Sequence, residues 1–167
     1  MTRPKAVLIG APGSGKTTIG KALAGRLGVT FRDTDTDVET TAGKPVGEIF
    51  IDDGESRFRE LERAAVRTAL AEHDGVMALG GGAILDPATQ ESLTGHTVVY
   101  LRVGLSDAVK RVGLASARPL LVLNPRSRLK ALMEERLPIY ERLAAITVAT
   151  DGREPADIVD EIVKEVT

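Results

Sequence analysis

Residues 10–17 read GAPGSGKT, a complete G-x-x-x-x-G-K-[ST] pattern, and an apolar run at 6–9 directly precedes them. Glycines in this pattern let backbone N–H groups turn inward around phosphate oxygens, and the helix that follows directs the positive end of its dipole at the same charge. Lys16 would then reach the β- and γ-phosphates, and Thr17 would bind a Mg²⁺ ion. An ordinary strand-to-helix turn is the alternative, but it does not require four fixed residues. The motif therefore predicts a strand, a phosphate-binding loop and a helix that together bind a nucleoside triphosphate.

The composition limits the class of protein. With 167 residues, of which 43% are hydrophobic and 28% charged, the chain suits one globular domain. A formal net charge of -2 provides no overall field for nucleic acid or anionic lipid, so we expect neither a nucleic-acid partner nor a membrane. Cysteine is absent, which excludes a disulfide framework and a cysteine-ligated metal. The first residues lead into the first apolar run without the long apolar stretch of a signal peptide, which predicts a cytoplasmic protein.

Short apolar runs alternate with helical patterns along the chain. The runs lie at 6–9, 29–32, 76–79, 97–101 and 146–149. This alternation is typical of a parallel α/β sheet, and the continuous apolar character of the runs indicates that helices cover both faces. Ligands in such folds bind at the carboxyl ends of the strands. The phosphate-binding loop, Asp33 with Asp35, and the glycines at 80–82 are all predicted to lie there.

Helices are predicted from apolar spacing and capping residues. They are expected at 55–73, from Asp86-Pro87 onward, at 127–143 and at Pro155–Val166. The apolar face of the first is expected to consist of Phe58, Leu61, Ala65 and Ala69. The stretch 113–125 has weak periodicity and an apolar centre, which favours a mobile lid over a ligand, with a plain surface loop as the alternative.

An acidic segment begins where the second strand is predicted to end. Many phosphate-binding-loop proteins take a metal contact from an aspartate at the end of a neighbouring strand, but here the strand at 76–79 is followed by Gly80. Residues two apart share a face in an extended segment, so we expect Asp33 and Asp35 to point together into the cleft. One would serve the metal and the other the acceptor hydroxyl. The alternative is an acidic turn that caps the next helix, which is the simpler account of Asp37.

Consecutive glycines and certain arginines complete the candidate site. The backbone of residues 80–82 carries no side chains, which suits the close approach of a small ligand. Planar guanidinium groups bind carboxylates and phosphates through paired hydrogen bonds. Spacing alone does not select particular arginines from the other basic residues. We interpret His73 and His96 as structural.

The motifs taken together closely resemble the shikimate kinase family in order and in spacing, over nearly the whole chain. The matching segments are Gly10 to Thr17, Asp33-Thr34-Asp35, Asp53-Gly54-Glu55 with Phe58-Arg59, Gly80-Gly81-Gly82, Arg118-Pro119-Leu120, and Arg136 before Pro138-Ile139-Tyr140. The resemblance implies a three-layer α/β/α fold like that of P-loop nucleoside monophosphate kinases, with a five-stranded parallel sheet in the order 2-3-1-4-5. It also implies a single domain over 1–167, with a substrate-binding helical region at about 34–62 and a lid at about 113–125. We expect a monomer.

The resemblance implies an activity as well. Members transfer the γ-phosphate of ATP to the 3-hydroxyl of shikimate, in the chorismate pathway to the aromatic amino acids. Asp35 would then orient or deprotonate the hydroxyl, and Asp33 would hold Mg²⁺ through its water shell alongside Thr17. Lys16 and Arg118 would be catalytic residues together with Asp35. Arg118, from the lid, would close over the β- and γ-phosphates and stabilise the charge of the transition state.

The same resemblance assigns residues to the two ligands. The shikimate-binding residues would be Asp35, Arg59, Gly80, Gly81, Gly82 and Arg136, with Phe50 and Phe58 as walls of the pocket. The nucleotide-binding residues would be Gly13, Ser14, Gly15, Lys16, Thr17, Thr18, Arg111, Arg118, Arg153 and Pro155. Arg59 and Arg136 would pair with the shikimate carboxylate, and Arg111 with 153–155 would enclose the adenine. Asp37 adds a third carboxylate beside the pair, either perturbing their pKa values or facing solvent.

Two other readings stay open. Gluconate kinase shares the fold and the phosphate-binding loop and also acts on a small hydroxylated acid, so an arginine pair does not exclude it. A non-catalytic regulator that binds a nucleotide is the second, but it gives no role to Arg59, Arg136 or the glycines at 80–82. A nucleic-acid-dependent ATPase is disfavoured by the small size and the absence of a basic face.

Overall fold

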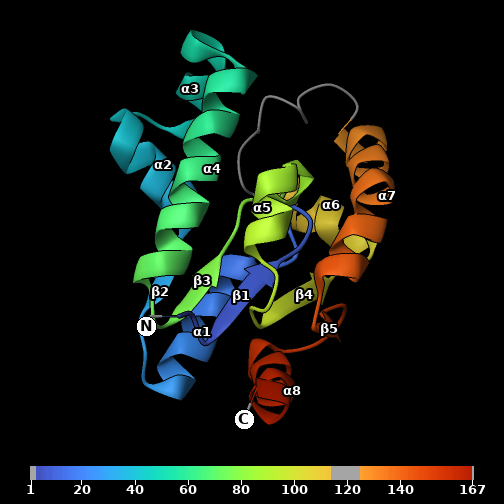
Figure 1. Cartoon of the computed structure of the whole chain (residues 1–167). Helices are drawn as coiled ribbons and strands as arrows, with labels where there is room; N and C mark the ends of the chain where they lie inside the picture. The colour runs from blue at the N-terminus through green and yellow to red at the C-terminus, as the bar shows by residue number, and fades with distance from the viewer. Residues whose placement is uncertain (1–2, 114–124, 167) are drawn as a thin grey trace.

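A computed structural model describes residues 3–113 and 125–166, and in it five parallel strands form one sheet in the order β2-β3-β1-β4-β5 (Figure 1). The strands are β1 (Ala6–Ile9), β2 (Phe31–Asp33), β3 (Val76–Ala78), β4 (Val98–Arg102) and β5 (Ile146–Ala149). The predicted strand order and parallel pairing are confirmed. The predicted bounds are exact for β1 and β5, and the other strands differ from them by one or two residues.

Helices lie on both faces of the sheet. They are α1 (Lys16–Leu27), α2 (Thr34–Ala42), α3 (Val46–Asp53), α4 (Glu55–Glu72), the 3-10 turn η1 (Ala83–Leu85), α5 (Pro87–Ser92), α6 (Leu105–Gly113), α7 (Pro125–Leu143) and α8 (Pro155–Val166). Asp86 caps α5 through hydrogen bonds from the amides of Ala88 and Thr89, as its position before a proline predicted.

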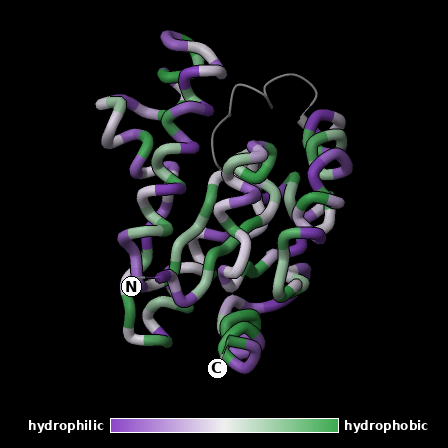
Figure 2. Tube along the Cα trace, viewed as in Figure 1, coloured by the Kyte–Doolittle hydropathy of each residue, from purple (hydrophilic) through white to green (hydrophobic). Residues whose placement is uncertain are grey.

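Alternate residues of the central strand enter two separate cores, which makes the fold three layers. Ala6 and Leu8 of β1 pack with residues of α1 and α8, whereas Val7 and Ile9 pack with residues of α4, η1 and α7. Both sets are fully buried, so β1 has no polar face. Figure 2 shows the central strands mostly in the green of hydrophobic residues, while the helices alternate between green and purple. Burial on both faces is the physical reason for the continuously apolar runs.

The helices α2, α3 and the first half of α4 form a projection with a small core of its own. Val38, Ile49 and Phe58 are buried there, and Phe50 packs against them. Figure 1 shows this projection at the left of the view and α7 at the right, while α4 and α7 both pack on the face of the sheet that Val7 and Ile9 enter. No helix within the described ranges is both long enough and apolar enough to cross a membrane.

The register of the strands explains why distant motifs meet. In the parallel pairs, Asp33 of β2 lies beside Ala78 of β3, and Ala78 lies beside Leu8 of β1. Three strands therefore end at the same edge, and the chain leaves them into the phosphate-binding loop, the acidic segment and the glycines at 80–82. The predicted lid at 113–125 lies outside the described residues, apart from its end residues in α6 and α7, and Arg118 lies outside them with it.

Candidate active site

The phosphate-binding loop leaves β1 and ends at the first residue of α1. Gly13 and Gly15 have φ angles of 81° and 92°, in the left-handed region that side chains disfavour, and Gly15 is the N-cap of α1. Gly10 is needed for space, because a Cβ there would lie 2.7 Å from the carbonyl oxygen of Leu101. Thr17 and Thr18 are exposed on the first turn of α1. The loop therefore has the backbone that phosphate binding requires.

Two cations lie against this loop. The Nζ of Lys16 donates to the carbonyl oxygens of Gly10 at 2.8 Å and Ala11 at 3.1 Å. Nη1 of Arg111, on α6, donates to the carbonyl oxygen of Gly13 at 2.9 Å. Both positive groups thus lie beside the backbone that would surround a polyphosphate, and α6 contributes to the site across nearly a hundred residues of sequence.

The acidic segment is folded differently from our expectation. Asp33 ends β2 and is the N-cap of α2, and its Oδ1 accepts a hydrogen bond of 2.9 Å from the amide of Asp35. Asp35 is therefore in the first helical turn, and the prediction that an extended backbone places it on one face with Asp33 is wrong. A carboxylate at an N-cap stabilises the helix start, so the capping turn and the candidate site are the same structure. Asp37 pairs with Arg32 at 2.7 Å, so it is neither the cap nor a purely solvated side chain.

The glycines at 80–82 leave room for charged side chains that lie directly against them. A Cβ on Gly80 would lie 2.6 Å from Oδ1 of Asp35 and 3.1 Å from Oε2 of Glu62. One on Gly82 would lie 2.7 Å from Nη2 of Arg59. Separations below 3 Å are shorter than real Cβ contacts, so the acidic and basic groups of the site occupy space that side chains would fill. This is a tertiary reason for three consecutive glycines, in addition to the tight strand exit.

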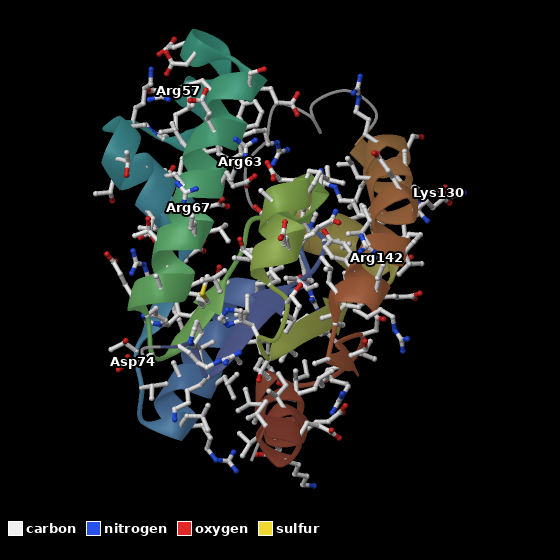
Figure 3. All side chains as sticks on the ribbon, in the orientation of Figure 1. Arg57, Arg63, Arg67, Asp74, Lys130 and Arg142 are labelled. Carbon is white, nitrogen blue, oxygen red and sulfur yellow. The ribbon has the colours of Figure 1, made fainter. Side chains whose placement is uncertain are left out.

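Arg59 is the arginine of the first half of α4 that turns toward these glycines. Its guanidinium carbon lies 5.3 Å from the centre of the Phe58 ring, which in turn lies 4.7 Å from the ring of Phe50. Arg57, Arg63 and Arg67, labelled in Figure 3, are exposed along the same helix. Burial therefore makes the selection among arginines that spacing did not.

Glu62 is a member of the site that the sequence analysis missed. Its side chain is only 4% exposed, and its Oε1 accepts a hydrogen bond of 2.8 Å from Nη1 of Arg59. Burial raises the pKa of the Glu62 carboxyl, and the charge of Arg59 opposes that shift. The predicted apolar face included Leu61 and Ala65, which are half-buried, whereas Glu62 is in the buried face itself. The sequence pattern that could have predicted Glu62 is a glutamate one turn after Arg59 within a mostly apolar helix face.

Arg136 approaches the glycines from the opposite side, on α7. It is 5% exposed, and its Nη1 lies 3.3 Å from the position of a Cβ on Gly81. Within the part of the chain that the structure describes, its buried Nε has no hydrogen-bond partner. A buried guanidinium with an unsatisfied donor is suited to an anionic ligand.

Two residues predicted to bind the nucleotide, Arg153 and Pro155, have structural contacts or positions away from the phosphate-binding loop. Arg153 donates from Nη1 to the carbonyl oxygen of Ala149 and pairs with Glu161, both at 2.8 Å, so its guanidinium joins β5 to α8. Pro155 is the first residue of α8. The structure thus brings together the phosphate-binding loop, Lys16, Arg111, the acidic segment, Arg59, Arg136 and the glycines at 80–82.

Comparisons with known proteins agree with this geometry. A family model described as shikimate kinase matches residues 12–167. A shikimate kinase of Salinispora tropica is 62% identical over 159 residues, which cover 95% of each chain. Among solved structures, a shikimate kinase of Acinetobacter baumannii in complex with shikimate has a TM-score of 0.94 at 33% identity, over 99% of this chain and 93% of that one.

The fold extends beyond this family. A gluconokinase of Sinorhizobium meliloti has a TM-score of 0.57 at 23% identity, over 96% of this chain and 90% of that one, which shows a shared fold alone. The family model and the relatives, by contrast, cover nearly the whole chain, and the matched residues 12–167 include Arg59, the glycines at 80–82 and Arg136. The chain belongs to the shikimate kinase family.

Proposed function

We propose that this protein transfers the γ-phosphate of ATP to the 3-hydroxyl of shikimate. The observation that carries the proposal is the buried guanidinium of Arg136, whose Nε lacks a partner in the described part of the chain, at the sheet edge that also carries the phosphate-binding loop. A nucleotide loop beside a buried cation suits a kinase whose acceptor is a small anion. Membership of the shikimate kinase family supports shikimate as that acceptor.

The acceptor would bind between α4 and α7. In this proposal Arg59 and Arg136 pair with its carboxylate, while the backbone of residues 80–82 approaches its ring hydroxyls. Phe50 and Phe58 form an apolar wall, which their ring contact of 4.7 Å supports. We assign this role to the helical region at about 34–62, which includes α2, α3 and the start of α4.

Asp35 would act on the reacting hydroxyl. It lies against Gly80, within the same group of side chains as Glu62, and its place in the first turn of α2 is held by the cap at Asp33. Its carboxylate would accept the proton that the 3-hydroxyl loses as the oxygen bonds to the γ-phosphorus, while ADP leaves. Lys16 would neutralise the phosphate charge during transfer.

Mg²⁺ fits the oxygen ligands available here. A hydroxyl from Thr17 and a carboxylate from Asp33 are the hard donors that Mg²⁺ prefers, and this ion usually completes its shell with water and substrate phosphate. The described residues hold no group of three acidic or histidine side chains that would form a closed metal cage, so any Mg²⁺ ligated here would draw on phosphate and water. When bound, the ion would neutralise charge on the phosphate oxygens.

The nucleotide would lie along the phosphate-binding loop. Backbone amides from Gly13 to Thr18 would hold its phosphates. Arg111, which donates to the Gly13 carbonyl oxygen, is assigned to the base by resemblance. Arg153, Pro155 and the lid residue Arg118 are included by resemblance, and Arg118 is outside the described residues. We further propose that the protein acts in the cytoplasm as a monomer.

The test is ADP release by the purified protein with Mg-ATP and one acceptor at a time. Shikimate, gluconate, nucleoside monophosphates and a blank without acceptor are compared. We expect release that depends on shikimate alone. Release with gluconate instead would favour the gluconate kinase reading, and nucleotide binding without release above the blank would favour a regulator.

A further inference from the structure

Two residues of α7 reach the glycines at 80–82 from the same face of the helix. Arg136 and Tyr140 are four residues apart, so their side chains lie one above the other. They are 5% and 1% exposed. Nη1 of Arg136 lies 3.3 Å from the position that a Cβ on Gly81 would take, and the hydroxyl of Tyr140 donates a hydrogen bond of 2.6 Å to the Gly81 carbonyl oxygen. The family resemblance gave Tyr140 no role, so this contact is a feature that the structure adds.

The hydrogen bond from Tyr140 restricts the backbone of the glycines, which have no side chains to restrict it. Three consecutive glycines leave the backbone with more conformational freedom than any other residues would. The carbonyls of Gly80 and Gly82 accept the amides of Ala83 and Leu85 at 3.1 Å within the turn that follows, whereas the Gly81 carbonyl accepts a hydroxyl from another helix. A peptide unit is planar and trans, so holding the oxygen of Gly81 also sets the direction of the next N–H group.

The hydroxyl is the part of Tyr140 that this contact requires. Its ring stacks on the ring of Tyr100, with centroids 5.0 Å apart and planes 17° apart, and a phenylalanine ring would fill the same space. Burial raises the pKa of Tyr140 to about 12, although Arg136 opposes the shift, so the phenol stays protonated at working pH. It is a permanent donor and does not act as a base.

We propose that Tyr140 is a positioning residue for acceptor binding, which fixes the Gly81–Gly82 peptide so that the Gly82 N–H group and the adjacent Arg136 keep one geometry toward the acceptor. The inference rests on the proposed function for its substrate. We expect Tyr140 to act on acceptor binding, because the hydrogen bond joins α7 to the glycines, although a Cβ on Gly81 would also lie 3.2 Å from Cδ of Pro12 in the phosphate-binding loop.

The test compares Tyr140→Phe with Tyr100→Phe, which removes a hydroxyl from the other ring of the same stacked pair. We expect Tyr140→Phe to raise the KM for shikimate about tenfold, the loss that one buried hydrogen bond gives, with the KM for ATP unchanged within about twofold. Tyr100→Phe should leave both KM values unchanged. Equal changes in both KM values, or an unchanged shikimate KM, would overturn the proposal.

A second measurement leaves Tyr140 intact in case its variant does not fold. The chain has two tyrosines, so in Tyr100→Phe the only phenol is Tyr140. We expect its buried hydroxyl proton to give a resolved proton NMR signal that shifts with shikimate and does not shift with ADP. A hydroxyl proton signal that does not shift when shikimate is added would refute the role of Tyr140. Failure of the proposed function is separate, because the wild-type protein would then release no ADP with shikimate.

Discussion

The buried carboxylate of Glu62 accepts a hydrogen bond of 2.8 Å from the guanidinium of Arg59, one turn earlier on α4. Among the arginines of this helix, Arg57, Arg63 and Arg67 are exposed, while Arg59 is held against Gly82 by this contact. The orientation of Arg59, which we propose to bind the acceptor, therefore depends on an acidic residue beside it. Because Glu62 is almost inaccessible to solvent, the pair is not screened as a surface ion pair is.

Glu62→Gln should weaken acceptor binding more than nucleotide binding. The amide keeps the volume of the side chain but loses the charge that orients Arg59, so we expect the KM for shikimate to rise about tenfold. Steady-state kinetics with each substrate varied in turn measures this. Glu60→Gln, an exposed position on the same helix, is the matched control and should behave as the wild type. Equal effects of the two substitutions would contradict the role of Glu62.

The same residue should contribute a pH-dependent part of the stability. Burial raises the pKa of Glu62 above its ordinary value of 4.5, so the folded protein binds this proton more tightly than the unfolded chain does. The stabilising contribution is complete below pH 4.5 and is lost as the pH rises through the folded-state pKa. The free energy of unfolding of the wild type, relative to Glu62→Gln, should therefore fall as the pH rises. Urea unfolding at several pH values measures it, and a constant difference would show that Glu62 makes no such contribution.

Gly80→Ala should reduce turnover because its new methyl group would lie 2.6 Å from Oδ1 of Asp35. Displacing that carboxylate by about 1 Å is expected to lower kcat about 100-fold. Gly25→Ala is the control, because a Cβ there meets nothing within 4 Å and alanine favours the interior of α1. Measured kcat values and melting temperatures separate an effect on the site from one on folding. Normal turnover by Gly80→Ala would mean that Asp35 tolerates displacement or does not act on the hydroxyl.

Asp35→Asn should abolish proton acceptance while keeping the side chain's shape. We expect kcat to fall by about 10² to 10⁴, the usual contribution of a general base, with little change in ADP affinity measured by calorimetry. Asp37→Asn is a useful comparison because that carboxylate pairs with Arg32 away from the glycines, and it should retain turnover. If Asp35→Asn keeps a normal kcat, Asp35 only borders the site.

Arg111 and Arg153 should differ in their effect on the nucleotide. Arg111 contacts the phosphate-binding loop at the carbonyl of Gly13, so Arg111→Ala should raise the KM for ATP about tenfold. Arg153 joins β5 to α8, so its alanine variant should lower the melting temperature and change the KM for ATP less. The reverse ranking in parallel assays would support the adenine contact of Arg153 that the family resemblance implies.

The fold class and the position of the candidate site at the carboxyl ends of the strands could be predicted from short sequence patterns. The phosphate-binding loop needs particular glycines between a strand and a helix, and continuous apolar runs need cover on both faces, so local patterns carry this information. Asp86 before Pro87 likewise marked the start of α5, because capping depends on neighbours within a few residues. The loop, the strands and this cap each depend on a short stretch of chain, and the structure has them close to the predicted residues.

Helical periodicity did not identify the side chains that line the candidate site: the family resemblance pointed to Arg136, and tertiary packing was needed to find Glu62 and Tyr140. Glu62, Arg136 and Tyr140 lie on helical faces whose partners come from distant segments, so periodicity alone does not distinguish them from their exposed neighbours. Asp35 lies in a helix because the Asp33 carboxylate accepts its amide, a local contact that the apolar pattern did not reveal. Burial and pairing arise when separate elements pack together, and charged groups there are held by contacts that no single segment contains.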